Sequence, residues 1–222
     1  MKNKEIFIYK MERLNRMDIF TRNVPGTTEI LQKSCIGIAG CGGLGSNAAV
    51  SLVRAGIGTL ILVDFDTVEK SNLNRQFFFQ SDTGKKKVEA LSVHLKAINP
   101  DINLITHPCE ITPQNVSVLF GSADLLIEAF DKAERKKWLI ESWCRSFPDK
   151  PVVCGNGLSG LGKFDDLKVT KIGNIYFCGD GKSDMSMGLC SARVAIVANM
   201  EANIAIEILV NKECVPEHRA CN

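Results

Sequence analysis

The sequence predicts an α/β protein with a Rossmann-like, mainly parallel sheet, helices on both faces of that sheet, and an irregular, partly antiparallel C-terminal part. Short apolar segments typical of buried strands alternate with amphipathic segments as far as residue 154, the order that a parallel sheet with crossover helices requires. A glycine-rich loop joins the first of these strands to the helix that follows it. The strands are expected at 35–39, 59–63, 102–106, 124–128 and 151–154.

The segments between these strands carry helical signals. Apolar side chains from Val88 to Leu95 recur with the helical period in residues 84–98. Thr112 offers an N-cap, and Pro113 suits the first position of a helix. The helices are expected at 44–56, 84–98, 112–120 and 132–146.

The two ends of the chain differ from this alternating core. Residues 5–20 space their apolar side chains as a helix does, so we expect an N-terminal helical segment at 1–33 and the main domain at 34–222. Residues 155–190 contain eight glycines, which favours loops. The remaining elements are two antiparallel strands at 167–171 and 174–178 and a final helix at 193–209.

Composition excludes several classes of protein. The 27 lysines and arginines nearly balance 25 acidic residues, so the formal charge of +2 predicts neither a nucleic acid nor a membrane as partner. The most apolar stretch, 194–210, is interrupted by acidic and amide side chains, so no membrane span is expected. The N-terminus lacks the apolar core of a signal peptide, which indicates a cytoplasmic protein.

Nine cysteines stand out, yet no Cys-x-x-Cys pair occurs. Without a secretion signal, a disulfide framework is not expected, and most of these thiols should behave as small core residues. The tail residues Cys214, His218 and Cys221 offer one ligand fewer than structural zinc usually takes. We therefore expect no structural zinc site.

The glycine-rich loop fits the pattern G-x-G-x-x-G in the context that gives this pattern meaning, after a strand and before a helix. Gly40 permits the tight turn, Gly42 lets backbone approach a phosphate, and Gly45 lets the helix pack closely on the sheet. The helix N-terminus then offers free N–H groups to an anion. Asp64 ends the second strand, where a carboxylate accepts hydrogen bonds from a ribose. An adenine nucleotide is therefore expected, with its identity still open.

Three further residues favour a triphosphate over a nicotinamide. Arg75 offers a planar donor fork for phosphate oxygens, and Lys87 places a charge at the start of a helix. Asp131 follows the fourth strand, where an acid can hold Mg²⁺ against phosphates. Each has a plainer interpretation: three consecutive lysines often form a solvated helix face, and an acid often caps a helix.

Several segments together resemble the superfamily of ubiquitin-like-protein activating enzymes, which includes ThiF and MoeB. The closest similarity is to the short ThiF type, the sulfur carrier protein ThiS adenylyltransferases. The resemblance extends over about residues 34–210. The segments are GCGGLGSN (40–47), LVDFDTVEKSNLNRQ (62–76), KVEAL (87–91), INPDI (98–102), EAFDKAE (128–134), YFCGDGKSD (176–184) and GLCSARV (188–194).

This resemblance implies a reaction in which the C-terminal Gly-Gly carboxylate of a small carrier protein attacks the α-phosphorus of ATP. Pyrophosphate leaves, and a sulfur donor later displaces AMP. The resemblance also implies a homodimer, in which Arg22 would reach the ATP of the partner subunit. The implied roles are ribose binding by Asp64, phosphate contacts by Asn72, Arg75, Gln76 and Lys87, Mg²⁺ binding by Asp131, and enclosure of the nucleotide by Gly40, Gly42, Gly43 and Gly45.

The sequence leaves the covalent chemistry and the exact substrate open. Some relatives use a cysteine in the loop before the last helix for a covalent link to the carrier, and Cys178 and Cys190 lie in that general region. We expect both to be packing residues. The carrier could instead serve a molybdopterin or cysteine pathway. The same motifs are compatible with a nicotinamide-dependent oxidoreductase, with ATP-dependent activation of a tRNA base, and with a non-catalytic carrier-binding partner.

Overall fold

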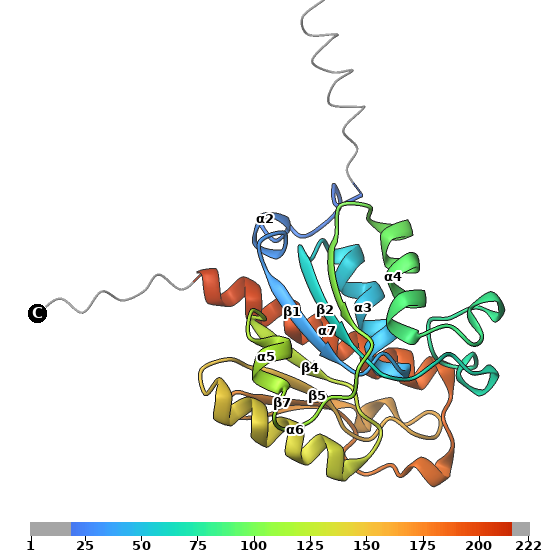
Figure 1. The fold of residues 1–222 in the computed structure, drawn as a ribbon. Coiled ribbons are helices and arrows are strands. Elements are labelled where there is room, and N and C mark those ends of the chain that lie inside the picture. The colour runs from blue at the N-terminus through green and yellow to red at the C-terminus, as the bar shows by residue number, and fades with distance from the viewer. Residues whose placement is uncertain (1–18, 215–222) are drawn as a thin grey trace, which may run out of the picture.

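The computed structural model describes residues 19–214, and within this range a single sheet of seven strands forms the centre of the protein (Figure 1). The strand order is β3-β2-β1-β4-β5-β7-β6, and all neighbours pair in parallel except β6 with β7. The strands are β1 (Cys35–Ala39), β2 (Thr59–Val63), β3 (Asn103–His107), β4 (Leu125–Glu128), β5 (Val152–Gly155), β6 (Lys168–Ile172) and β7 (Ile175–Gly179).

Helices cover both faces of this sheet and bury one hydrophobic cluster against each face. The face with α3, α4 and α7 carries the larger cluster, and α5 and α6 cover the other face. The fold class predicted from the sequence is therefore confirmed. The helices are α2 (Thr28–Leu31), α3 (Gly43–Ala55), α4 (Lys87–Ile98), α5 (Val116–Phe120), α6 (Ala133–Ser146) and α7 (Ser191–Cys214), with 3₁₀ turns at Lys70–Asn72, Gln80–Asp82, Phe164–Asp166 and Met185–Met187.

The observed elements differ from the predicted ones mainly at their ends. The helix expected at 112–120 begins only at Val116, because the side chain of Asn115 accepts the N–H of Thr112 and closes a turn before it. The sequence did not predict α2, whose Leu31 joins the larger core cluster. Residues 1–18, which hold most of the expected leading helix, lie outside the described residues. The boundary between 1–33 and 34–222 stays a prediction.

The strand order brings β1 next to β4, with Ala39 opposite Glu128 at their carboxyl ends. From β1 the chain continues toward β2 and β3 on one side, and from β4 toward β5 and β7 on the other. Ligands in open parallel sheets bind where the strand order reverses in this way. The loops that follow β1, β2, β3, β4, β5 and β7 meet at this edge and form the candidate site.

One helix, α7, is long and apolar enough to cross a membrane over Ser191–Lys212. In the structure it packs on the sheet and on α3, and it contributes Val197, Ala198 and Ala205 to the larger core cluster (Figure 1). One face of this helix is thus buried in the fold, and 39% of its most apolar stretch lies inside the structure. The absence of a membrane partner stays a prediction.

Candidate active site

A cavity of about 510 Å³ lies at the carboxyl edge of the sheet. Its walls come from three parts of the chain: residues 40–87, residues 109–136 and residues 155–194. Three of the predicted site residues, Gly45, Asn72 and Arg22, do not line it. The predicted residues that do line it are Gly40, Gly42, Gly43, Asp64, Arg75, Gln76, Lys87 and Asp131.

The glycine loop has the geometry that its sequence predicts. Gly40 has φ of +97°, a conformation open to glycine and strained for other residues. A Cβ at Gly45 would lie 1.9 Å from the carbonyl oxygen of Gly40, so only glycine lets α3 start this close to the turn. Gly45 therefore acts through packing and does not enclose the cavity itself. Ser46 ties the loop to the next segment, since its hydroxyl donates to the Gly42 carbonyl and accepts the N–H of Phe77.

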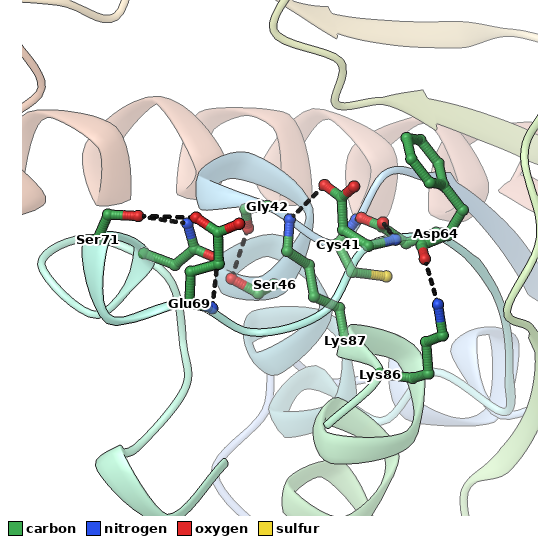
Figure 2. A network of polar contacts seen from close by, with 11 residues as sticks. Cys41, Gly42, Ser46, Asp64, Glu69, Ser71, Lys86 and Lys87 are labelled. Carbon is green, nitrogen blue, oxygen red and sulfur yellow. Dashed lines mark hydrogen bonds and ion pairs between the residues drawn. The ribbon is translucent and has the colours of Figure 1, made fainter. Parts of the chain in front are cut away.

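Asp64 is held at the end of β2 by two backbone groups. One carboxylate oxygen accepts the N–H of Cys41 at 2.6 Å, and the other accepts the N–H of Asp66 at 2.8 Å (Figure 2). The side chain belongs to a residue that is only 8% exposed, and it faces the cavity beside the glycine loop. Each oxygen keeps a second lone pair, so the carboxylate retains capacity for a hydroxyl donor.

The three consecutive lysines have three different positions. Lys85 is exposed and pairs with Asp82, and Lys86 donates to the carbonyl of Phe65. Lys87 alone is buried and lines the cavity, where its ammonium lies 2.7 Å from Asp66 (Figure 2). The structure thus separates one site lysine from two surface neighbours. Asp66 is a lining residue that the sequence did not single out, although it is the next polar residue after Asp64 that follows β2.

Arg75 and Gln76 close the same wall. The Arg75 guanidinium donates to the carbonyl of Ser71 and to the side chain of Asn74, which fixes its direction. The side-chain oxygen of Gln76 is buried and has no hydrogen-bond partner within the described residues. Such a group usually has a ligand or water as partner. Asn72 was expected at the phosphates, but its oxygen accepts the N–H of Glu69 and caps a 3₁₀ turn instead.

The middle wall contains Asp131, which is exposed at the rim of the cavity just beyond β4. Behind it, Glu128 is fully buried and lies 2.7 Å from Lys136, which lines the cavity. Glu201 from α7 is also fully buried, and neither of its oxygens has a partner in the described part of the chain. Burial raises the pKa of both glutamates. Sequence patterns do not reveal this cluster, because Glu201 is more than sixty residues away along the chain from Glu128 and Lys136.

Magnesium ligands are sparse in this site. Among the described residues, no three His, Cys, Asp or Glu side chains lie close enough together to hold a metal ion by themselves. Mg²⁺ is commonly bound by one or two carboxylates together with substrate phosphates. The exposed carboxylate of Asp131 fits that arrangement, whereas Asp66 is already paired with Lys87.

Comparison with known proteins decides the family. The family model described as "ThiF family" matches residues 15–222. The chain belongs to the ThiF family. Among curated relatives, the adenylyltransferase and sulfurtransferase UBA4 of Candida glabrata is 34% identical over 149 residues, which are 67% of this chain and 34% of the relative. The adenylyltransferase and sulfurtransferase MOCS3 of Anopheles gambiae is 29% identical. The match covers 83% of this chain and 43% of the relative. This chain spans about a third of the length of the first relatives.

Solved structures with the same fold include the E. coli tRNA N6-threonylcarbamoyladenosine dehydratase TcdA in complex with AMP. The TM-score is 0.78 at 22% identity, covering 85% of this chain and 91% of that one. E. coli MccB with ATP has a TM-score of 0.67 at 22% identity, covering 83% of this chain and 58% of that one. These similarities place the ThiF-family chain in the same Rossmann-like fold.

Arg22, which the family resemblance assigned to a partner's site, lies away from the cavity. It is exposed and lies beside Asn23, whose amide donates to the carbonyl of Ala55 at the far end of α3 from the glycine loop. It cannot reach the cavity of its own chain, so its role in a partner's site stays a prediction.

The cysteine predictions concern Cys178 at the end of β7 and Cys190 just before α7. Cys178 is fully buried, and burial raises its pKa to about 12, which fits a packing residue. Cys190 is half-buried just before α7, next to the lining residue Leu189. All seven cysteines with described side chains are free thiols. The Cys214, His218 and Cys221 side chains lie outside the described residues.

Proposed function

We propose that this chain is an ATP-dependent adenylyltransferase that activates the C-terminal Gly-Gly carboxylate of a ThiS-like sulfur carrier protein, in thiamine thiazole biosynthesis. The observation that carries the proposal is the position of Lys87, a buried ammonium that lines the cavity on the same wall as the glycine loop and Asp64. A dinucleotide redox site needs a ribose acid but no such cation. A transferring phosphoryl group needs one.

The residues suggest how the reaction proceeds. Asp64 accepts the ribose hydroxyls, and the N–H groups at the start of α3 face the phosphates. A carboxylate oxygen of the carrier attacks the α-phosphorus, and the bond to the bridging oxygen of pyrophosphate breaks. Negative charge grows on the phosphate oxygens during this step. Lys87 and Arg75 stabilise that charge, with Lys87 exchanging its contact with Asp66 for a phosphate.

Magnesium would be held by Asp131 together with the phosphates. When bound, the ion supplies neutralisation of phosphate charge. Further parts of the proposal are a homodimer in which Arg22 completes the partner's site, a separate sulfur donor that consumes the adenylate, and a cytoplasmic location.

The decisive experiment is carrier-dependent exchange of labelled pyrophosphate into ATP, with Mg²⁺ and a ThiS-type carrier ending in Gly-Gly. Exchange that requires the carrier, ATP and Mg²⁺ together is the expected result. No exchange with any Gly-Gly carrier would overturn the proposal. Calorimetry with NAD against ATP provides the control for an oxidoreductase function, and binding of NAD alone would favour that function.

The choice of carrier is tested in the same assay. The UBA4 and MOCS3 relatives are named adenylyltransferases and sulfurtransferases, which supports carriers of other sulfur pathways as the second candidate. A molybdopterin-type or cysteine-pathway carrier can replace the ThiS-type carrier in parallel reactions. A higher kcat/KM with either would reassign the pathway while keeping the adenylyl transfer.

A further inference from the structure

A buried ion pair lies behind the wall formed by residues 155–194. The Arg193 guanidinium is 2.7 Å from the Asp180 carboxylate, and both residues are nearly inaccessible to solvent. Arg193 is in the first turn of α7, where the helix dipole disfavours a cation. The position of Arg193 is therefore explained by its hydrogen-bond partners and not by the dipole of α7.

Asp180 organises the loop that follows β7. One of its oxygens binds Arg193, and the other accepts the backbone N–H groups of Lys182 and Ser183. Burial alone would raise the pKa of Asp180, but these hydrogen bonds lower it to about 2. These hydrogen bonds thus favour the ionised form of Asp180. A Cβ at Gly157 would lie 2.0 Å from the same carboxylate, so the loop after β5 packs directly against it.

The guanidinium nitrogen of Arg193 that does not contact Asp180 hydrogen-bonds the loop after β5. Its guanidinium donates to the carbonyl oxygens of Gly162 and Lys163. A further link joins the two loops, since the N–H of Ser159 donates to the hydroxyl of Ser183. One ion pair therefore fastens both loops to the start of α7.

These two loops form a wall of distinct chemistry. No lysine or arginine occurs among its cavity-lining residues, whereas the wall formed by residues 40–87 presents Lys87 and Arg75. A wall without cations is unsuited to a triphosphate, and small residues allow close approach of an uncharged peptide backbone. The small and polar lining residues of this wall include Gly155, Asn156, Gly157, Ser159 and Ser183, and its charged lining residue is the acidic Asp184.

We propose that Asp180 and Arg193 are positioning residues that shape this wall to receive the C-terminal tail of the carrier protein. The inference rests on the proposed function and adds to it which part of the site selects the second substrate. The hydrogen bonds described for Asp180 and Arg193 all join residues within 155–194. A substitution that disturbs this ion pair should therefore weaken carrier binding and leave ATP binding intact.

The test uses Asp180→Asn, which removes the charge and keeps the shape, and Ser183→Ala, which removes the hydroxyl that accepts the N–H of Ser159 and donates to Asp180. Asp165→Asn on the exposed 3₁₀ turn is the matched control. With a ThiS-type carrier, we expect Asp180→Asn to raise the carrier KM about tenfold and Ser183→Ala about threefold, as the loss of buried hydrogen bonds implies. The ATP KM and the kcat should stay within about twofold in all three variants.

The outcomes are distinct. An unchanged carrier KM, or an ATP KM that rises in parallel with it, would overturn the positioning role. If Asp180→Asn does not fold, Ser183→Ala decides the question, because it removes a hydrogen bond to Asp180 and keeps both charges of the ion pair. Absence of carrier-dependent exchange in the wild-type chain would overturn the proposed function itself, and this is seen before any variant is compared.

Discussion

The wall formed by residues 40–87 presents its cations to the cavity, whereas the wall formed by residues 155–194 keeps its cation behind the surface. Lys87 and Arg75 line the cavity directly, and Arg193 instead holds loops together from behind. Lys136 combines both positions, since it lines the cavity and pairs with buried Glu128. This difference fits the proposal that one wall performs chemistry and the other defines shape. Substitutions of cavity-lining charges and of buried charges should therefore affect activity and stability separately.

The largest effect is expected for the buried cluster. Lys136→Met leaves Glu128 and Glu201 buried without a cation, which should lower the free energy of unfolding by about 3–5 kcal/mol. Urea unfolding followed by tryptophan fluorescence measures this change. Lys137→Met, at an exposed neighbouring position, is the control. A loss below about 1 kcal/mol, typical of surface pairs, would show that the cluster does not support the fold.

Lys87→Ala tests the opposite behaviour. It should slow carrier-dependent pyrophosphate exchange by about 100- to 1000-fold, as expected when a charge-stabilising group is removed. Its partner Asp66 is half-exposed, so the stability should change little. Lys85→Ala, on an exposed side chain of the same lysine run, is the control. Retained activity in Lys87→Ala would remove Lys87 from its proposed role in the chemistry.

Glu201 gives a pH-dependent prediction. Because burial raises its pKa, the folded protein keeps a proton that the unfolded chain loses above the ordinary value of 4.5. Stability should therefore fall as pH rises, by up to about 1.4 kcal/mol per unit for one proton. Glu201→Gln removes this dependence.

The measurement is urea unfolding of Glu201→Gln and wild type between about pH 5 and about pH 8. The free energy of unfolding of Glu201→Gln should increase relative to that of the wild type as pH rises. Glu207→Gln, exposed on the same helix, should follow the wild type. A constant difference between Glu201→Gln and wild type would show that Glu201 is ionised in the fold.

The smallest effect is expected for the thiols of the wall formed by residues 155–194. Cys190→Ser should keep the exchange rate within about threefold of the wild type, since we expect a packing role for this thiol. Non-reducing electrophoresis of enzyme mixed with the activated carrier should show no linked complex. A linked complex that disappears in Cys190→Ser would give this wall a covalent role and contradict the division between the two walls.

The sequence predicted most of the fold, because alternating apolar segments and glycine stops are local signals. It also predicted the residues of the first wall that belong to one short segment, from Gly40 to Lys87. It placed the start of α5 too early, because the Asn115 side chain closes a turn before the helix. Asn72 caps a 3₁₀ turn and is not among the cavity-lining residues, and its phosphate role stays a prediction. It missed Asp66, since nothing in its spacing distinguishes a paired carboxylate from a solvated one.

What the sequence by itself determined is a glycine loop, a ribose acid and a family resemblance that the comparison with known proteins confirmed. Only the tertiary structure decided which of three lysines enters the cavity, and which charges lie behind its second wall. The packing of α7 on the sheet brings Arg193 to Asp180 and Glu201 to Glu128. Burial is a property of the whole fold, and burial is what distinguishes these charges from the many on the surface.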